Sequence, residues 1–339
     1  MLADLIIPIL GATGALYLLG SWIWDACFSR LARIPNAHWS SPISPIWILY
    51  TRYCGTELEV LHEAHQRWGS VVRVGPRDLS VSCYNDGVRT IYGGGMDKPD
   101  YYDYFQYHGY YLGSPFSVAR ADIRVSIIRV NNAFSTKLRA DHSVRRRRVA
   151  GLYTKSFIRN SPHLAAIIQT VIDGRLLPLM TKLAGKAEPF CMLRLSWALS
   201  FDIMTSFVFG LEVGTNLLAD VSEIDKIAGC YDDRYPAEAF WKKEAPRIYN
   251  ILAFCGWEPL GPRNKKYQHA REYLESWTLR MCEEANAMLD RPQQPAQESG
   301  AYPAVYAQMK KSIDEEYSQL DSKSKMTLIA SELFDHFCE

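Results

Sequence analysis

The feature that most constrains this chain is an uncharged apolar run near its N-terminus, Leu5 to Trp24. A stretch of about 20 such residues is long enough to cross the hydrocarbon core of a bilayer as one helix. Asp25 closes the run, and Arg30 and Arg33 follow it. Because basic residues gather on the cytoplasmic side of membrane helices, we expect the rest of the chain to face the cytosol.

Two other structures could account for the same run. A cleaved signal peptide would have a basic start and a cleavage site between small residues, whereas Asp4 precedes this run and Cys27-Phe28-Ser29 makes a poor site. A buried core helix would show a polar side, which the run lacks. The sequence therefore predicts a short tail over 1–4 and a single transmembrane anchor over 5–24, bound to the lipid bilayer.

The composition behind the anchor is that of a folded globular body. Of the 339 residues, 48% are hydrophobic, which is enough for a sizeable core. The net charge is +1, from 38 basic and 37 acidic residues, so no overall field favours a nucleic-acid partner. The eight cysteines form no CxxC pair or zinc spacing, so we predict no metal site; they are Cys27, Cys54, Cys83, Cys191, Cys230, Cys255, Cys282 and Cys338.

A proline-rich strap follows the anchor over residues 25–50. Pro35, Pro42 and Pro45 bar a continuous helix in this part of the chain. An amphipathic helix is expected next, over 57–68, and Gly69 has the residue type that helix C-termini prefer.

The clearest strand signal lies just beyond that helix. Residues 71–74 and 79–82 are rich in Val, Leu and Ser around a Gly75-Pro76 turn, which predicts two short strands. A short helix is expected from Asp86 to Tyr92, ended by Gly93-Gly94-Gly95. The glycine triplet lacks the flanking strand and the Lys-Ser/Thr ending of a phosphate-binding loop.

From about residue 140 the pattern is overwhelmingly helical. Asp202 would lie on a buried face of one of these helices, where a hydrogen-bonded core residue is the simplest interpretation. The sequence predicts a mainly α fold with a small N-terminal β-sheet. The expected helices span 143–152, 164–183, 192–210, 265–289, 304–311 and 323 to the end.

The order of these segments resembles the first half of microsomal cytochrome P450 monooxygenases of the fungal type. The similar stretches are the hairpin around Gly75-Pro76, Lys98 to Tyr102, Asp141 to Arg148 and Trp197 to Gly210. The resemblance implies that residues 51–339 form a partial P450 domain behind one transmembrane helix, and that the chain ends within the family's I-helix.

The same resemblance implies a cofactor, partners and a compartment. The family uses haem and molecular oxygen, takes electrons from NADPH-cytochrome P450 reductase, and hydroxylates small lipophilic substrates. The implied localisation is the endoplasmic reticulum membrane, with one pass and the body facing the cytosol.

Site residues can be carried over from the family at one place. Its C-helix usually shows Trp-x-x-x-Arg, whose side chains face the haem propionates, and His142 and Arg146 hold these two positions here. An imidazole N–H and a guanidinium both suit a carboxylate. The alternative for Arg145 to Arg148 is a solvated basic helix face or an import-like basic run.

The family's catalytic loop has no counterpart in the sequence. That loop, Phe-x-x-Gly-x-Arg-x-Cys-x-Gly, supplies the thiolate on the iron. None of the eight cysteines is flanked by the Phe, Gly and Arg residues of this motif. The oxygen-handling Ala/Gly-Gly-x-Asp/Glu-Thr turn is absent too. We therefore predict no catalytic residue and no metal ligand, haem that is not stably bound, and a truncated protein that is inactive alone.

Residues 111–130 interrupt the family pattern and could be an insertion or a retained intron. Two other hypotheses stay open for the whole chain. It could be the N-terminal portion of a functional P450, cut short by the gene model, or a membrane-tethered interaction protein.

Overall fold

The computed structural model describes residues 13–338 apart from 15–16, 18, 22, 25, 108–129, 187–188, 235–239 and 257–262. The chain divides into two compact units, Met1–Met96 and Asp97–Glu339. Most of the predicted anchor at 5–24 lies outside the described residues, and so does segment 111–130 except for Val130.

The first unit is small and combines helices with one two-stranded sheet. Helices α2 (Ile46–Cys54), α3 (Glu57–Trp68) and α4 (Arg89–Gly93) accompany strands β1 (Val71–Arg73) and β2 (Leu79–Val81). The strands are antiparallel and pair Val72 with Ser80. Buried Ile48, Ala64, Val72 and Val74 form the core of this unit. The predicted helix over 57–68 is confirmed, and so is the hairpin.

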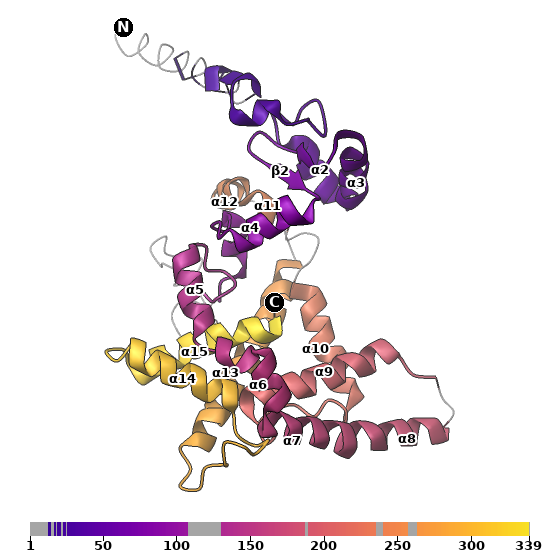
Figure 1. Cartoon of the computed structure of the whole chain (residues 1–339), viewed down its shortest axis with the longest axis vertical. Helices are drawn as coiled ribbons and strands as arrows, with labels where there is room; N and C mark the ends of the chain where they lie inside the picture. Colours follow the sequence, from indigo (N-terminus) through magenta and orange to yellow (C-terminus); the bar gives the residue numbers. More distant parts are fainter. Residues whose placement is uncertain are drawn as a thin grey trace. The chain divides into compact units, whose positions relative to one another are not determined.

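The second unit is a bundle of helices (Figure 1). α7 and α8 continue into one another through a π-helical turn at Ile172–Leu176. Within the described residues the helices are α5 (Arg139–Arg147), α6 (Lys155–Asn160), α7 (Pro162–Val171), α8 (Leu177–Lys186), α9 (Met192–Phe209), α10 (Val221–Arg234), α11 (Phe240–Glu244), α12 (Pro246–Phe254), α13 (Arg263–Leu289), α14 (Ala304–Glu316) and α15 (Ser322–Cys338).

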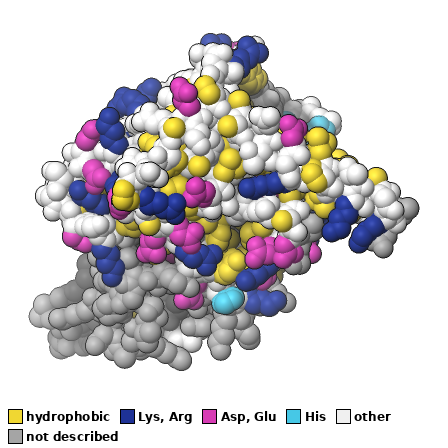
Figure 2. Space-filling view, turned by 90° about the horizontal axis from the view of Figure 1, so that it is seen from below, with side chains coloured by type: hydrophobic (Ala, Val, Ile, Leu, Met, Phe, Trp, Pro, Cys, Tyr) yellow, Lys and Arg dark blue, Asp and Glu magenta, His cyan; other side chains and the backbone are white. Residues whose placement is uncertain are grey.

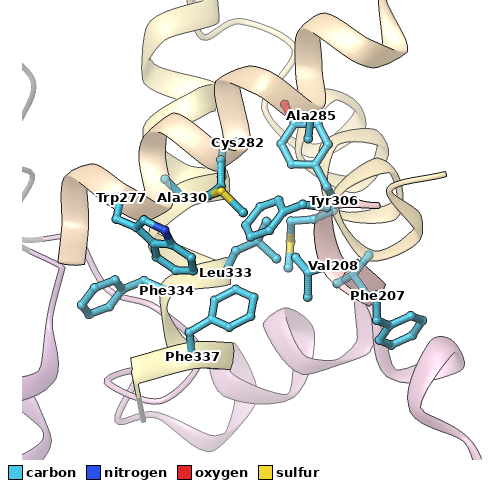
Figure 3. Close-up of a cluster of buried hydrophobic side chains, with 14 of the residues drawn as sticks. Phe207, Val208, Trp277, Cys282, Ala285, Tyr306, Ala330, Leu333, Phe334 and Phe337 are labelled. Carbon is cyan, nitrogen blue, oxygen red and sulfur yellow. The ribbon is translucent and has the colours of Figure 1, made fainter. Parts of the chain in front are cut away.

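The core of the second unit lies where α9, α13, α14 and α15 meet (Figure 3). Phe337 of α15 stacks on Phe209 of α9 with ring centroids 5.6 Å apart, and Trp277 of α13 meets Phe337 edge-on at 5.6 Å. Each such pair contributes about 0.5–1.5 kcal/mol beyond the area it buries. This packing fixes one face of α15 against three helices.

The predicted fold class, mainly α with one small sheet near the N-terminus, is confirmed. Several helix ends differ from the sequence prediction. α5 begins at Arg139 instead of residue 143, and α14 extends to Glu316 instead of residue 311. Within the predicted strap, α2 starts at Ile46, directly after Pro45. A proline is tolerated in that place because the first backbone N–H groups of a helix have no partner within it.

Two helical stretches of the described residues are long and apolar enough to cross a membrane, judged by length and composition. They are Pro162–Lys186, which comprises α7 and α8, and Met192–Phe209, which is α9. Core helices meet the same criterion, and α9 buries Ala198, Val208 and Phe209 in the bundle. The packing of α9 is therefore that of a core helix.

Apolar side chains also reach the surface of the second unit. Ile168, Leu177, Met192, Leu193 and Trp197 are all exposed. In the space-filling view, hydrophobic side chains emerge in several small groups separated by charged ones (Figure 2).

Candidate functional site

Helix α5 carries both residues that the resemblance assigns to a haem-propionate site. Asp141 lies in its first turn, and Arg145, Arg146 and Arg147 lie in its last turn. Acidic residues near the N-terminus and basic residues near the C-terminus complement the helix dipole. The backbone N–H of Arg139 donates to Asp97 Oδ1 at 2.8 Å, which holds the start of the helix.

The basic run of α5 separates into two pairs in the folded protein. Arg145 and Arg148 are directed inward and both donate to Glu332 of α15. Arg148 also donates to Glu316 of α14 at 2.7 Å. Arg146 and Arg147 are exposed, and neither has an ion pair or hydrogen bond to another described side chain. A uniformly solvated basic face is therefore wrong for this helix, because half of the run holds α5 against α14 and α15.

His142 and Arg146 line one pocket of about 450 Å³ in the second unit. Its walls come from α5 and the turn after it, from α15, and from the segments around residues 98 and 134. The described lining residues are Lys98, Ala133, Phe134, His142, Arg145, Arg146, Val149, Ala150, Tyr153, Met309, Glu332, Asp335 and His336. The two residues predicted from the sequence are thus brought together at the same concave surface.

Lys98 adds a third nitrogen group to this side of the pocket. Its Nζ donates to the carbonyl oxygen of Phe134 at 2.6 Å and lies 5.0 Å from the ring centre of Tyr102. Burial, together with the positive charges of Lys98 and Arg146, lowers the pKa of His142. His142 is therefore neutral at pH 7 and gains a favourable partner when an anion enters.

The pocket also contains a pair that the sequence did not predict, His336 on α15 and Tyr153 on the turn after α5. Tyr153 Oη lies 2.7 Å from His336 Nδ1, and the two rings stack with centroids 5.5 Å apart. Burial lowers the pKa of His336 to about 4 and raises the pKa of Tyr153. Both side chains are therefore neutral at pH 7. No local pattern announces this pair, since 183 residues separate its members.

The chemistry of this pocket is anion recognition beside an apolar surface. The side chains of Lys98, Arg146 and His142 can meet carboxylate or phosphate oxygens. Phe134, Val149 and Met309 offer apolar contact. Within the described residues, no group of three or more His, Cys, Asp and Glu side chains could hold a metal ion. Fold and site together define a mainly helical protein with a pocket between α5 and α15 that both basic and acidic side chains line.

Comparison with known proteins identifies the relatives of this chain. Tryprostatin B 6-hydroxylase of Aspergillus fumigatus is 35% identical over 83 residues, which are 23% of this chain and 14% of that protein. Pisatin demethylase of Fusarium vanettenii is 29% identical over 151 residues, 44% of this chain and 24% of that protein. Cytochrome P450 monooxygenase BipB of Cochliobolus sativus is 28% identical over 206 residues, 61% of this chain and 37% of that protein.

The predicted resemblance is confirmed: the curated homologues of this chain are fungal cytochrome P450 monooxygenases. The chain spans less than two fifths of the length of the three relatives named above. No family model matches it. No solved structure matches it.

Proposed function

We propose that this chain is a cytochrome P450 monooxygenase-like protein and that the pocket between α5 and α15 receives the propionate side of haem. The observation that carries the proposal is the meeting of His142, Arg146 and Lys98 at one pocket. The donor set fits the group, because two haem propionates need N–H donors and these three side chains supply them.

Each residue has a distinct role in this proposal. The exposed guanidinium of Arg146 has N–H donors directed for a bidentate contact with one carboxylate. His142 donates a single N–H, and Lys98 contributes a charge that its backbone partners hold at the pocket wall. Arg145 takes no direct part, since Glu332 already occupies its guanidinium.

When bound, haem supplies the oxygen-activating iron of P450 monooxygenases, which hydroxylate small lipophilic molecules with electrons from an NADPH-dependent reductase. None of the described lining residues of the pocket is a cysteine. We therefore propose that this chain alone binds haem weakly, without a thiolate on the iron, and does not hydroxylate a substrate alone. We place it at the endoplasmic reticulum membrane, held by the predicted anchor at 5–24, with the body in the cytosol.

Haem titration of the purified full chain in detergent tests the proposal. Arg146→Ala should weaken binding about 10- to 100-fold, the equivalent of a charge-assisted hydrogen bond pair. The matched control is Arg147→Ala, which removes the same charge one residue along the helix but does not line the pocket. That variant should bind within about threefold of the wild type, because exposed charges are screened. Equal losses in the two variants would show that only net charge matters, which contradicts the site.

A second ligand separates carboxylate recognition from apolar contact. Haem dimethyl ester has the same ring without free carboxylates, so the wild type should bind it less tightly than haem. The preference for haem should largely disappear in Arg146→Ala. Reduction in the presence of carbon monoxide then tests the missing thiolate: a thiolate-type Soret band from this chain alone would refute the proposed lack of activity.

A further inference from the structure

Helix α2 is apolar on its exposed side as well as on its buried side. Ile48 and Thr51 are buried, with 1% and 5% of their surface exposed. Ile46, Tyr50 and Tyr53 follow one another by about one turn along the other side and are 72%, 65% and 64% exposed. A helix at a protein surface ordinarily carries polar or charged residues on the side that water covers. This outer face of α2 instead carries only apolar and aromatic residues.

An apolar pocket of about 760 Å³ lies beside the outer face. Its walls come from helical residues between 19 and 27, from the turn before α2 and from the turn of the hairpin. Arg77 is the only charged residue among the described residues that line it, whereas Ile23 and Ile43 offer apolar contact. Ile46 belongs to the pocket and to the outer face, so the two surfaces are continuous. Such walls favour hydrocarbon, because a charged ligand would lose its hydration there without gaining partners.

The chain around these two surfaces is basic. No Asp or Glu occurs between Asp25 and Glu57 in the sequence, whereas Arg30, Arg33 and Arg52 do. Arg52 is the one charged residue of α2, and its Nε donates to Oε1 of Glu57 at 2.9 Å. Arg30 and Arg33 are exposed and lie in the 3₁₀ turn Arg30–Arg33. Exposed guanidinium groups next to an apolar surface complement the anionic headgroups of a lipid leaflet.

Exposed aromatic rings accompany the same segment. Trp24 and Phe28 stack with ring centroids 5.6 Å apart, and both are exposed. Trp39, in the turn before α2, is also exposed. Indole and phenol rings favour the boundary between hydrocarbon and water, because they combine an apolar body with a polar tip.

We propose that the outer face of α2 and the apolar pocket beside it lie in the membrane interface and contact lipid acyl chains below anionic headgroups. This inference rests on the membrane placement in the proposed function and deepens it, since it adds a second lipid contact to the predicted anchor. Helical residues between 19 and 27 form one wall of the pocket, so lipid around the anchor reaches α2 without a gap. This continuity and the basic charge favour a lipid surface over a second protein as the occupant.

Photolabelling of the full chain in vesicles of equal parts phosphatidylcholine and phosphatidylserine tests the inference. A carbene reagent that dissolves only in the lipid phase should label the outer face of α2 as well as the anchor at 5–24, as read by mass spectrometry. Leu58 of α3 is the control for exposure alone. It is 84% exposed, but Glu57 and Glu59 flank it, so its labelling should be several-fold lower.

Two double variants test the apolar face and the basic charge separately. Ile46→Glu with Tyr50→Glu should abolish labelling of the outer face and leave that of the anchor, because carboxylates avoid hydrocarbon. Both side chains are exposed, so the fold should be kept, as far-UV circular dichroism checks. Arg30→Gln with Arg33→Gln should reduce labelling of α2 to the level that the wild type shows in pure phosphatidylcholine.

The labelled positions separate the inference from the proposed function. Label in the anchor without label on α2 would overturn the inference and leave the anchor intact. Label on α2 without label in the anchor would support the inference and refute the anchor. Label on neither would refute the membrane placement itself. Equal labelling of α2 with and without phosphatidylserine would overturn the role of anionic headgroups.

Discussion

Arg148 and Glu332 form a buried ion pair, with Nη1 of the arginine 2.6 Å from Oε1 of the glutamate. The arginine directly follows α5, and the glutamate lies in the middle of α15, 184 residues away. Glu332 also accepts from Arg145, and Arg148 also donates to Glu316. This network joins α5 to the helical core and so places the pocket that α5 shares with α15.

Removal of the glutamate should destabilise the fold strongly. Glu332→Ala leaves the buried guanidinium of Arg148 with Glu316 as its remaining acidic partner, and we expect a loss of about 3 kcal/mol in the free energy of unfolding. The measurement is urea-induced unfolding followed by far-UV circular dichroism. An exposed pair provides the control: Glu212→Ala, which breaks the contact with Arg291, should cost less than about 1 kcal/mol. Equal losses of stability in the two variants would show that the ion pairs of Glu332 are not shielded from solvent.

Stability should fall on acidification in a way that depends on His336. Burial lowers the pKa of His336 to about 4, against 6.5 for a free histidine. As pH falls, the unfolded chain takes up the proton first, so acid favours unfolding. The stability that the neutral ring contributes is complete above about pH 6.5 and is lost progressively as the pH falls towards 4. The total loss of unfolding free energy is about 3 kcal/mol at most.

Unfolding of His336→Leu at a series of pH values measures this contribution. The difference in unfolding free energy between the wild type and the variant should change with pH only in the window between about 4 and 6.5. Glu332 and Asp335 lie beside His336 and are retained in both proteins, so subtraction removes their titration. A constant difference across that window would contradict the predicted neutral state of the ring.

Asp202 is a structural acceptor, as the sequence indicated. It is fully buried, and its Oδ1 accepts from Thr215 Oγ1 and from the backbone N–H of Leu217, both at 2.8 Å. The backbone N–H of Leu218 donates to Oδ2 at 3.1 Å. Asp202→Ala leaves several buried donors without a partner, and we expect a loss of about 3 kcal/mol or more.

The graded variant for this position is Asp202→Asn. Its amide keeps one acceptor oxygen but turns the other position into a donor, so we expect about half the loss of Asp202→Ala. Thermal unfolding of both variants checks the order. A neutral effect of Asp202→Ala would mean that water replaces the carboxylate.

Gly210 ends α9 in a conformation that other residues rarely adopt, with φ at 84°. A Cβ at this position would lie 2.1 Å from the carbonyl oxygen of Ala301, which belongs to backbone and cannot rotate away. Gly210→Ala should therefore destabilise the protein by about 2 kcal/mol or more.

The control for Gly210 lies inside α10. A Cβ on Gly229 would meet nothing within 4 Å, and the residue has an ordinary helical backbone. Gly229→Ala should leave stability unchanged or raise it by up to about 1 kcal/mol. Chemical unfolding of both variants should therefore give effects of opposite sign or clearly different size.

Much of the local structure was predictable from the sequence. The apolar period of Glu57–Trp68 and the Gly75-Pro76 turn between two short apolar runs predict α3 and the hairpin. These signals are readable because helices and turns depend on residues that are only a few positions apart. The spacing of His142 and Arg146 also places both on one side of a helix, four residues apart.

The sequence by itself therefore determined the class of the fold and the positions of most of the long helices, and it places His142 and Arg146 one helical turn apart. Only the tertiary structure decided which arginines of the basic run are buried, because Glu316 and Glu332 come from helices more than 160 residues away. It likewise decided that Tyr153, on the turn after α5, and His336, on α15, meet in the same pocket. Long-range packing makes these choices, since a buried charge or imidazole is stable only where distant residues supply its partner.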